Sequence, residues 1–243
     1  MNHCGILDDV MAAHGGRERW RALEAVECSL SCGGLAFASH CQGRALRDLR
    51  PIVRPHDREV VFRDFCRPGW RGRWSPMQVQ IRDDGNRLIG ERQDPRASFG
   101  RLVKQFCWDK LDILYFGGYA LWNYLSFPFI LEEPGVSDVS GERVAAGGWR
   151  LTATFEAGFP THSARQVFHL DDSLRLVRHD YTADVIGGWA TAANLCLAAA
   201  ETEGLRFYTR RKVLPRFGGG ERVMPWPVLV WIEIDDVALG VVG

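Results

Sequence analysis

The chain has 243 residues, of which 30 are basic and 30 acidic, so its formal net charge is zero. Hydrophobic residues make up 46% of the chain and aromatic residues 11%, which is enough apolar surface for a folded core and excludes disorder as the main state. A zero net charge argues against general nucleic-acid binding, which usually needs a basic excess.

The N-terminal segment predicts short helices and no export signal. Residues 1–16, MNHCGILDDVMAAHGG, contain neither a basic start nor a continuous apolar stretch, so they do not match a secretory signal peptide. We therefore expect a cytoplasmic protein. Residues 6–23 place apolar side chains at helical spacing, and Gly15 and Gly16 interrupt this pattern, as glycines do at helix ends.

Short strands are expected from residue 25 onward. Turn residues separate the β-prone stretches, and Asp84, Gly85 and Asn86 give the clearest hairpin turn. The predicted strands span 25–37, 44–54, 58–65, 71–75, 77–82 and 87–93. Short strands about ten residues apart predict an antiparallel sheet rather than βαβ units.

The middle of the chain, residues 94–131, has helical spacing and many aromatic residues. Residues 113–131 carry no charge and are long enough to span a bilayer, but Gly117, Gly118 and Pro128 interrupt a helix there. We therefore expect no integral membrane span. The prediction is a helical insert that is buried against the sheet.

Strand patterns return after the insert. The predicted strands span 136–144, 148–156, 164–170, 174–184, 192–203, 206–216 and 228–237. Residues 192–203 could instead be helical because alanine and leucine dominate them, but their place between two hairpin partners favours a strand. No linker divides the chain, so we expect a single domain over residues 1–243. The expected fold class is α+β, mostly β: a large curved antiparallel sheet, or half-barrel, with an N-terminal helix and the insert covering its concave face.

This layout resembles the lipoprotein-carrier (LolA-like) superfamily, whose members have an N-terminal helix, a curved antiparallel half-barrel and a helical plug between strand groups. The resemblance implies a cavity that holds acyl chains or other hydrophobic ligands. Four phrases also resemble an uncharacterised bacterial family of similar length. They are HGGRERWRAL (14–23), DPRASF (94–99), WDKLDILYFGGYALWNYLSFPF (108–129) and RHDYTADVIGG (178–188).

The candidate catalytic residues are His179, Tyr181 and Asn123. Strand alternation places His179 and Tyr181 on the same face as Val177, and this apolar neighbour indicates that the face points inward. An inward His beside a Tyr could act as a general acid/base pair, or both could simply be packed in the core. Asp180, on the opposite face, is expected to be solvated or paired with Arg210 or Lys212 of a neighbouring strand.

The candidate ligand-binding residues come from the insert and from two strands. Tyr115, Tyr119 and Trp122 share one helical face and could line a cavity or form an ordinary core stripe. Arg211 faces opposite to its neighbours on its strand, so it could hold a ligand carboxylate or phosphate from an inward position, or it could belong to a solvated face of the sheet. The full set of ligand-binding candidates is Tyr115, Tyr119, Trp122, His162, Gln166 and Arg211.

No cofactor and no metal site are expected. The chain contains no GxGxxG, GxxxxGK[ST], GxSxG or HExxH pattern, and its seven cysteines include no CxxC pair. The first hypothesis is a cytosolic binding protein that encloses a hydrophobic small molecule or acyl chain. The alternatives are a cyclase, isomerase or related enzyme acting on a lipid- or polyketide-like substrate in the same cavity, and an interaction module that docks through its aromatic insert. The oligomeric state stays open.

Overall fold

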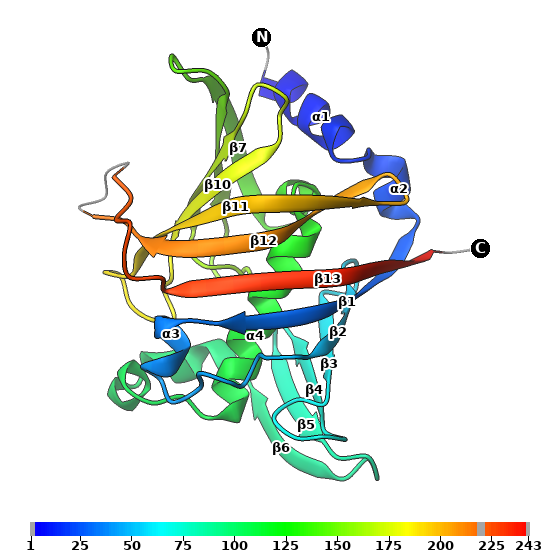
Figure 1. Cartoon of the computed structure of the whole chain (residues 1–243), viewed down its shortest axis with the longest axis vertical. Coiled ribbons are helices and arrows are strands. Elements are labelled where there is room, and N and C mark those ends of the chain that lie inside the picture. The colour runs from blue at the N-terminus through cyan, green and yellow to red at the C-terminus, as the bar shows by residue number, and fades with distance from the viewer. Residues whose placement is uncertain (1–2, 218–221, 242–243) are drawn as a thin grey trace.

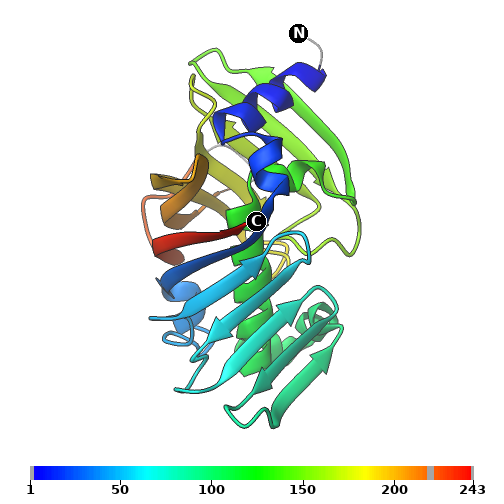
Figure 2. The same ribbon diagram turned by 90° about the vertical axis from the view of Figure 1, so that its right-hand side faces the viewer.

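One antiparallel sheet curves around a central helix. The computed structural model describes residues 3–217 and 222–241, and in this part of the chain thirteen strands form a single sheet in the order β6-β5-β4-β3-β2-β1-β13-β12-β11-β10-β9-β8-β7. Figures 1 and 2 show the sheet bending around helix α4 (Lys110–Ser126). The predicted half-barrel, with its helical insert on the concave face, is confirmed.

The sheet has two halves that meet where β1 pairs with β13. The first half contains β1 (Leu23–Gly33), β2 (Arg50–Arg54), β3 (Glu59–Arg63), β4 (Arg71–Ser75), β5 (Gln78–Arg82) and β6 (Leu88–Gln93). The second half contains β7 (Val136–Arg143), β8 (Trp149–Phe155), β9 (Arg165–Leu170), β10 (Leu176–Thr182), β11 (Thr191–Thr202), β12 (Leu205–Pro215) and β13 (Val230–Val241). All other neighbours in the sheet follow one another in sequence, so each half is built from antiparallel strands that are consecutive in the chain.

The insert connects the two edges of the sheet. It leaves edge strand β6, passes through the short helices η1 (Pro95–Gly100) and η2 (Leu102–Gln105), and runs as α4 under the concave face. It then reaches edge strand β7 through η3 (Phe129–Glu132). This path explains why α4 is buried on almost every side. No helix of the described residues is long and apolar enough to cross a bilayer.

Helix α4 starts at a well-defined capping box. The Asp109 carboxylate accepts hydrogen bonds from the backbone N–H groups of Leu111 and Asp112, and the Asp112 carboxylate accepts one from the N–H of Asp109. Arg92 and Lys104 pair with both carboxylates. These ion pairs balance the charge of the buried Asp112 and fix where the helix begins.

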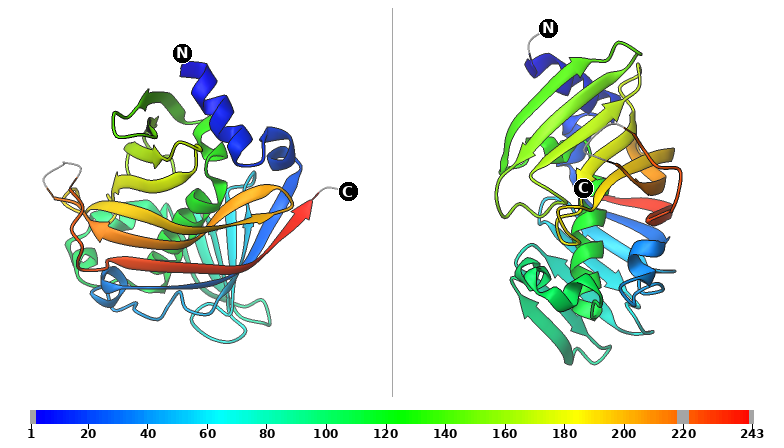
Figure 3. Two further views of the ribbon diagram at one scale, coloured as in Figure 1. Left: turned by 45° about the horizontal axis from the view of Figure 1, so that its top comes forward. Right: turned by 90° about the vertical axis from the view of Figure 1, so that its left-hand side faces the viewer.

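The N-terminal helices close one end of the half-barrel. Helix α1 (His3–Ala13) is followed by α2 (Arg17–Arg21), with the two glycines between them, as predicted. The fully buried His14 holds α1 to the sheet: its Nδ1–H donates to the Val10 carbonyl at 2.8 Å, and its Nε2 accepts from the Tyr208 hydroxyl of β12 at 2.8 Å. Figure 3 shows α1 from a second side.

Two expected strands differ from the structure. The strand predicted over 25–37 ends at Gly33, because Gly34 has a φ of 132° and turns the chain into helix α3 (Leu35–Ala38). The strand predicted over 44–54 begins only at Arg50. The uncertain segment 192–203 is a strand, β11, and it pairs with β10 and β12.

Candidate functional site

A large apolar cavity opens at one end of the half-barrel, beside α3. Its volume is about 450 Å³. Its walls are α3, the loop after β10, and the adjoining ends of β11, β12 and β13; α3 and these strand ends are on the left in Figure 1. Its polar lining residues include His40 and Arg216, and most of the others are apolar. Trp189 lies at the cavity with 76% of its surface exposed.

Two smaller hollows continue from this cavity along α4. A hollow of about 30 Å³ lies between α4 and strands β1 and β13, and it shares Phe116, Tyr181 and Val230 with the large cavity. A hollow of about 10 Å³ follows, and it shares Tyr124 with the previous one. The concave face therefore carries a broken channel from the open end to a polar interior.

A buried tyrosine–histidine cluster lies beside this channel. His162 contacts two hydroxyl groups of α4, that of Tyr119 at its Nδ1 (3.2 Å) and that of Tyr124 at its Nε2 (3.0 Å). The Tyr124 and Tyr181 hydroxyls are 3.1 Å apart, and the His162 and Tyr181 rings stack with their centroids 3.8 Å apart. The cluster links α4 to β10 at the centre of the molecule.

A second chain of hydrogen bonds holds His179. Its Nε2 lies 2.6 Å from Oε1 of Gln166, whose Nε2 donates to the Thr161 hydroxyl at 2.6 Å. Thr161 donates in turn to Oδ1 of Asn123 at 2.6 Å, and the Asn123 amide donates to the Pro160 carbonyl. These polar groups satisfy one another, as buried polar groups do.

Burial keeps every titratable member of both clusters neutral near pH 7. It lowers the pKa of His162 to about 3 and that of His179 well below its usual value. Burial also raises the pKa of Tyr124 to about 12 and that of Tyr181 well above its usual value. The histidines are therefore weak bases and the tyrosines weak acids, which suits a fixed hydrogen-bonding wall better than proton transfer.

These buried histidines predict an acid-sensitive fold. Burial also lowers the pKa of His14 to about 4, although its bond to the Val10 carbonyl opposes this shift. The unfolded chain takes up protons below about pH 6.5 while the folded protein does not, so stability should fall as the pH drops from there toward each folded pKa. Each such histidine contributes a slope of up to about 1.4 kcal/mol per pH unit in that window.

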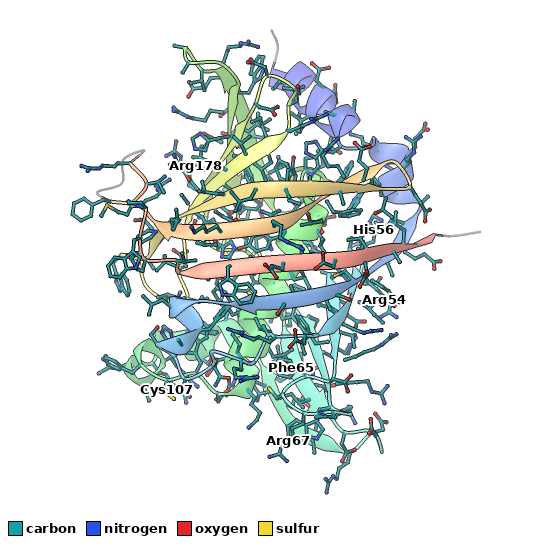
Figure 4. The ribbon with its side chains drawn as sticks, viewed as in Figure 1. Arg54, His56, Phe65, Arg67, Cys107 and Arg178 are labelled. Carbon is teal, nitrogen blue, oxygen red and sulfur yellow. The ribbon has the colours of Figure 1, made fainter. Side chains whose placement is uncertain are left out.

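Urea unfolding at pH 7.5, 6.0 and 5.0 measures this slope. We expect His14→Gln to have a shallower pH dependence than the wild type, with His56→Gln as the matched surface control; His56 is labelled in Figure 4. Equal free energies of unfolding at all three pH values would contradict the prediction.

Arg211 and Asn194 carry buried polar atoms without a hydrogen-bond partner, as do His40, Trp74, Ser126, Arg206 and Arg216 among the described residues. Arg211 is 2% exposed and Asn194 is fully buried. The Nε of Arg211 and both amide atoms of Asn194 make no hydrogen bond among the described residues. Sequence reasoning left Arg211 open between an inward ligand contact and a solvated sheet face, and it missed Asn194. The signal was an asparagine in an otherwise apolar strand segment, AANLC (192–196).

The structure brings most of the predicted site residues together, but not all. His179, Tyr181, Asn123, His162, Gln166 and Arg211 lie in or beside the polar interior. Tyr119 joins them through His162, whereas Tyr115 packs on Phe99, and Trp122 donates its Nε1–H to the Pro55 carbonyl at 2.9 Å.

The helix face that lines the channel is not the predicted one. Tyr115, Tyr119 and Trp122 line none of the three hollows, and the neighbouring face with Phe116 and Tyr124 lines them instead. The three predicted side chains are also buried, so they form no docking surface in this structure.

Asp180 is on the opposite face from His179 and is paired rather than solvated, but its partners are not the expected Arg210 and Lys212. It is 3% exposed and receives hydrogen bonds from Arg178, labelled in Figure 4, and from His169. Arg216 pairs with it at 2.6 Å. Val177 is exposed rather than inward, because the register between β9 and β10 shifts between Leu176 and Arg178.

A comparison with solved structures bears on the fold. No protein-family model matches the sequence, and neither does any curated protein. A LolA superfamily protein from Nitrosomonas europaea superposes with a TM-score of 0.50 at 10% identity, over 100% of this chain and 96% of that one. This match shows that the chain has the LolA-like half-barrel fold.

Two other solved structures are also similar. A DUF1329 family protein from Desulfovibrio piger matches with a TM-score of 0.49 at 14% identity, over 98% of this chain and 92% of that one. The lipoprotein LppX of Mycobacterium tuberculosis matches with a TM-score of 0.28 at 12% identity, over 76% of this chain and 91% of that one.

Proposed function

We propose that this protein binds a hydrophobic small molecule or acyl chain inside the half-barrel. The apolar cavity of about 450 Å³ beside α3 carries this proposal. Ligand sites are typically mostly apolar hollows of about 300–1,000 Å³ with a few polar groups that orient the ligand. The LolA-like fold supports the proposal, because a half-barrel around a helix leaves a hollow of this kind on its concave face.

Burial of apolar ligand surface would drive binding, at about 25 cal/mol for each Å² removed from water. Leu35 and Trp189 are exposed at the cavity, and a ligand in the mouth would cover part of their surface. The shared residues Phe116, Tyr181 and Val230 would let a long ligand reach from the mouth into the inner hollow.

Binding without turnover fits the site better than catalysis. His179 and Tyr181 are the candidate acid/base pair, but burial shifts the pKa of each in the direction that weakens its proton transfer near pH 7. His179 is also held to Gln166 at 2.6 Å. A cytoplasmic location stays a prediction.

A cavity-filling variant tests the proposal. Ala190 lines the large cavity, so Ala190→Phe should weaken binding of the apolar dye Nile red by about tenfold or more through loss of space. Ala198→Phe is the matched control, because Ala198 is an exposed alanine of β11 outside this cavity. Dye fluorescence measures affinity, and native mass spectrometry of the purified protein detects any ligand already bound.

The result expected is saturable, stoichiometric dye binding by the wild type and by Ala198→Phe only. Absence of saturable binding in the wild type, together with a ligand-free mass that adding hydrophobic compounds does not change, would refute the proposal. Equal affinity of the two variants would place the binding site outside the cavity.

A further inference from the structure

Arg211 is a buried cation without a carboxylate partner. Among the residues that the structure describes, no Asp or Glu oxygen lies within ion-pair distance of its guanidinium. Its two hydrogen bonds are long: Nη1 lies 3.4 Å from Sγ of Cys196, and Nη2 lies 3.3 Å from the Tyr124 carbonyl oxygen. Its Cζ also lies over the rings of Tyr124 and Tyr208, at 4.4 and 5.5 Å from the ring centroids. Burying a lone charge in this way is unfavourable unless something pairs with it.

Other well-covered arginines of the described chain are paired. Arg216 binds Asp180, and Arg92 binds Asp109 and Asp112. The exception at Arg211 therefore does not reflect a general lack of acidic partners in the fold. It points to a partner that is not part of the chain.

Asn194 lies between Arg211 and the large cavity. Asn194 pairs with Val213 across β11 and β12, and Cys196 pairs with Arg211 one step further along. Paired residues of antiparallel strands point to the same face, so Asn194 and Arg211 share the concave face. Ala192 and Val213 line the large cavity. Asn194 lines none of the three hollows, but it lies on this face one residue pair nearer to the cavity than Arg211, and its amide is close enough to the Tyr124 hydroxyl to lower the pKa of that group.

We propose that the ligand is an amphiphile with a single carboxylate, and that it binds with this headgroup inward. The inference rests on the proposed function and names the ligand class for that site. The carboxylate would accept hydrogen bonds from Arg211 and from the Asn194 amide, while the hydrocarbon chain fills the cavity toward Trp189. Charge-assisted bonds of this type are among the strongest that a protein makes.

The size of the polar end favours a carboxylate over a phosphate. The hollow at Arg211 is only about 10 Å³, and Arg211 is the one cation that lines it. Tyr124 is the common wall of the two inner hollows, and its hydroxyl is bonded to His162 and Tyr181, so entry of the headgroup would require these two bonds to break and the ring to move. A larger, doubly charged headgroup would need more space and a second cation.

Calorimetric titration with laurate and with 1-dodecanol tests the inference, because the two ligands share the same hydrocarbon length and differ at the headgroup. We expect the wild type to bind laurate about tenfold or more tightly than dodecanol. Arg211→Met should abolish this preference while dodecanol still binds, and Asn194→Leu should reduce it. Arg210→Met is the matched control on β12, because Arg210 pairs with Asp235 instead and should leave the preference intact.

Each other outcome has a distinct meaning. Equal affinity of the wild type for laurate and dodecanol overturns the headgroup assignment and leaves the hydrophobic site standing. If an Arg211→Met variant shown to be folded by circular dichroism still prefers laurate, the headgroup assignment is likewise overturned and the hydrophobic site stands. Tighter binding of dodecyl phosphate than of laurate overturns the carboxylate class. Binding of none of these ligands, nor of Nile red, removes the proposed function as well.

Discussion

Replacing Arg211 with methionine is expected to raise the stability of the ligand-free protein. The substitution keeps a long flexible side chain of similar shape and removes a charge that has no carboxylate partner among the described residues. Replacing buried charges with apolar groups stabilises proteins by up to about 1–4 kcal/mol. In a chain of this size each kcal/mol corresponds to a melting temperature about 2–4 °C higher.

The matched comparison is Arg216→Met. Arg216 is also well covered, but it pairs with the buried Asp180 at 2.6 Å, so its removal should destabilise the protein. Thermal unfolding of the wild type and both variants, free of ligand, measures the two shifts. Melting-temperature shifts of opposite sign in the two variants would indicate that the Arg211 guanidinium serves ligand binding and not stability. A large loss of stability in Arg211→Met would show instead that its ring contacts with Tyr124 and Tyr208 hold the fold together.

A single methyl group at Gly118 is expected to be the most damaging small substitution in α4. A Cβ at this position would overlap the Cβ and Cγ atoms of Trp74, which is fully buried on β4. Neither the helix nor the indole can move without disturbing the core, and such overpacking costs about 1–3 kcal/mol or more. We expect Gly118→Ala to lower the free energy of unfolding by at least this amount.

Gly117→Ala is the matched control one residue earlier. Its Cβ would come 3.0 Å from the Cδ1 atom of Leu46, the end of a flexible side chain, and it would border the hollow of about 30 Å³. Alanine is also about 1 kcal/mol better than glycine in a helix. Urea unfolding should therefore show a nearly neutral or stabilising effect at 117 and a strong loss at 118. Similar effects at both positions would contradict the packing of α4 against Trp74.

The positions of the strands along the chain followed from local patterns. Alternating side chains and turn residues predicted strands close to those observed, including the hairpin turn at Asp84, Gly85 and Asn86. Gly33 and Gly34 were harder to interpret, because the turn into α3 depends on a close approach of Gly34 to Leu229, far away in sequence. No pattern in the residues around Gly34 predicts that contact.

The polar interior was predictable on the strands and not on the helix. Alternation placed Tyr181 and His179 inward and put Arg211 on the face opposite to its neighbours, since a strand in a one-layer sheet has only two faces. Helix α4 is buried on nearly all sides, so its periodicity cannot show which face meets a cavity. The sequence analysis considered the face with Tyr115 and Trp122 as a cavity lining, whereas the channel runs along the neighbouring face.

The sequence by itself determined the antiparallel strands and the buried helix, because periodicity and turn chemistry act over a few residues, and the resemblance to the LolA-like superfamily implied the half-barrel. Only the tertiary structure decided the site. Pairing of β11 with β12 places Asn194 beside Arg211, and no carboxylate reaches either one among the described residues. Whether a buried charge has a partner depends on every element packed around it, and the sequence near Arg211 does not contain that information.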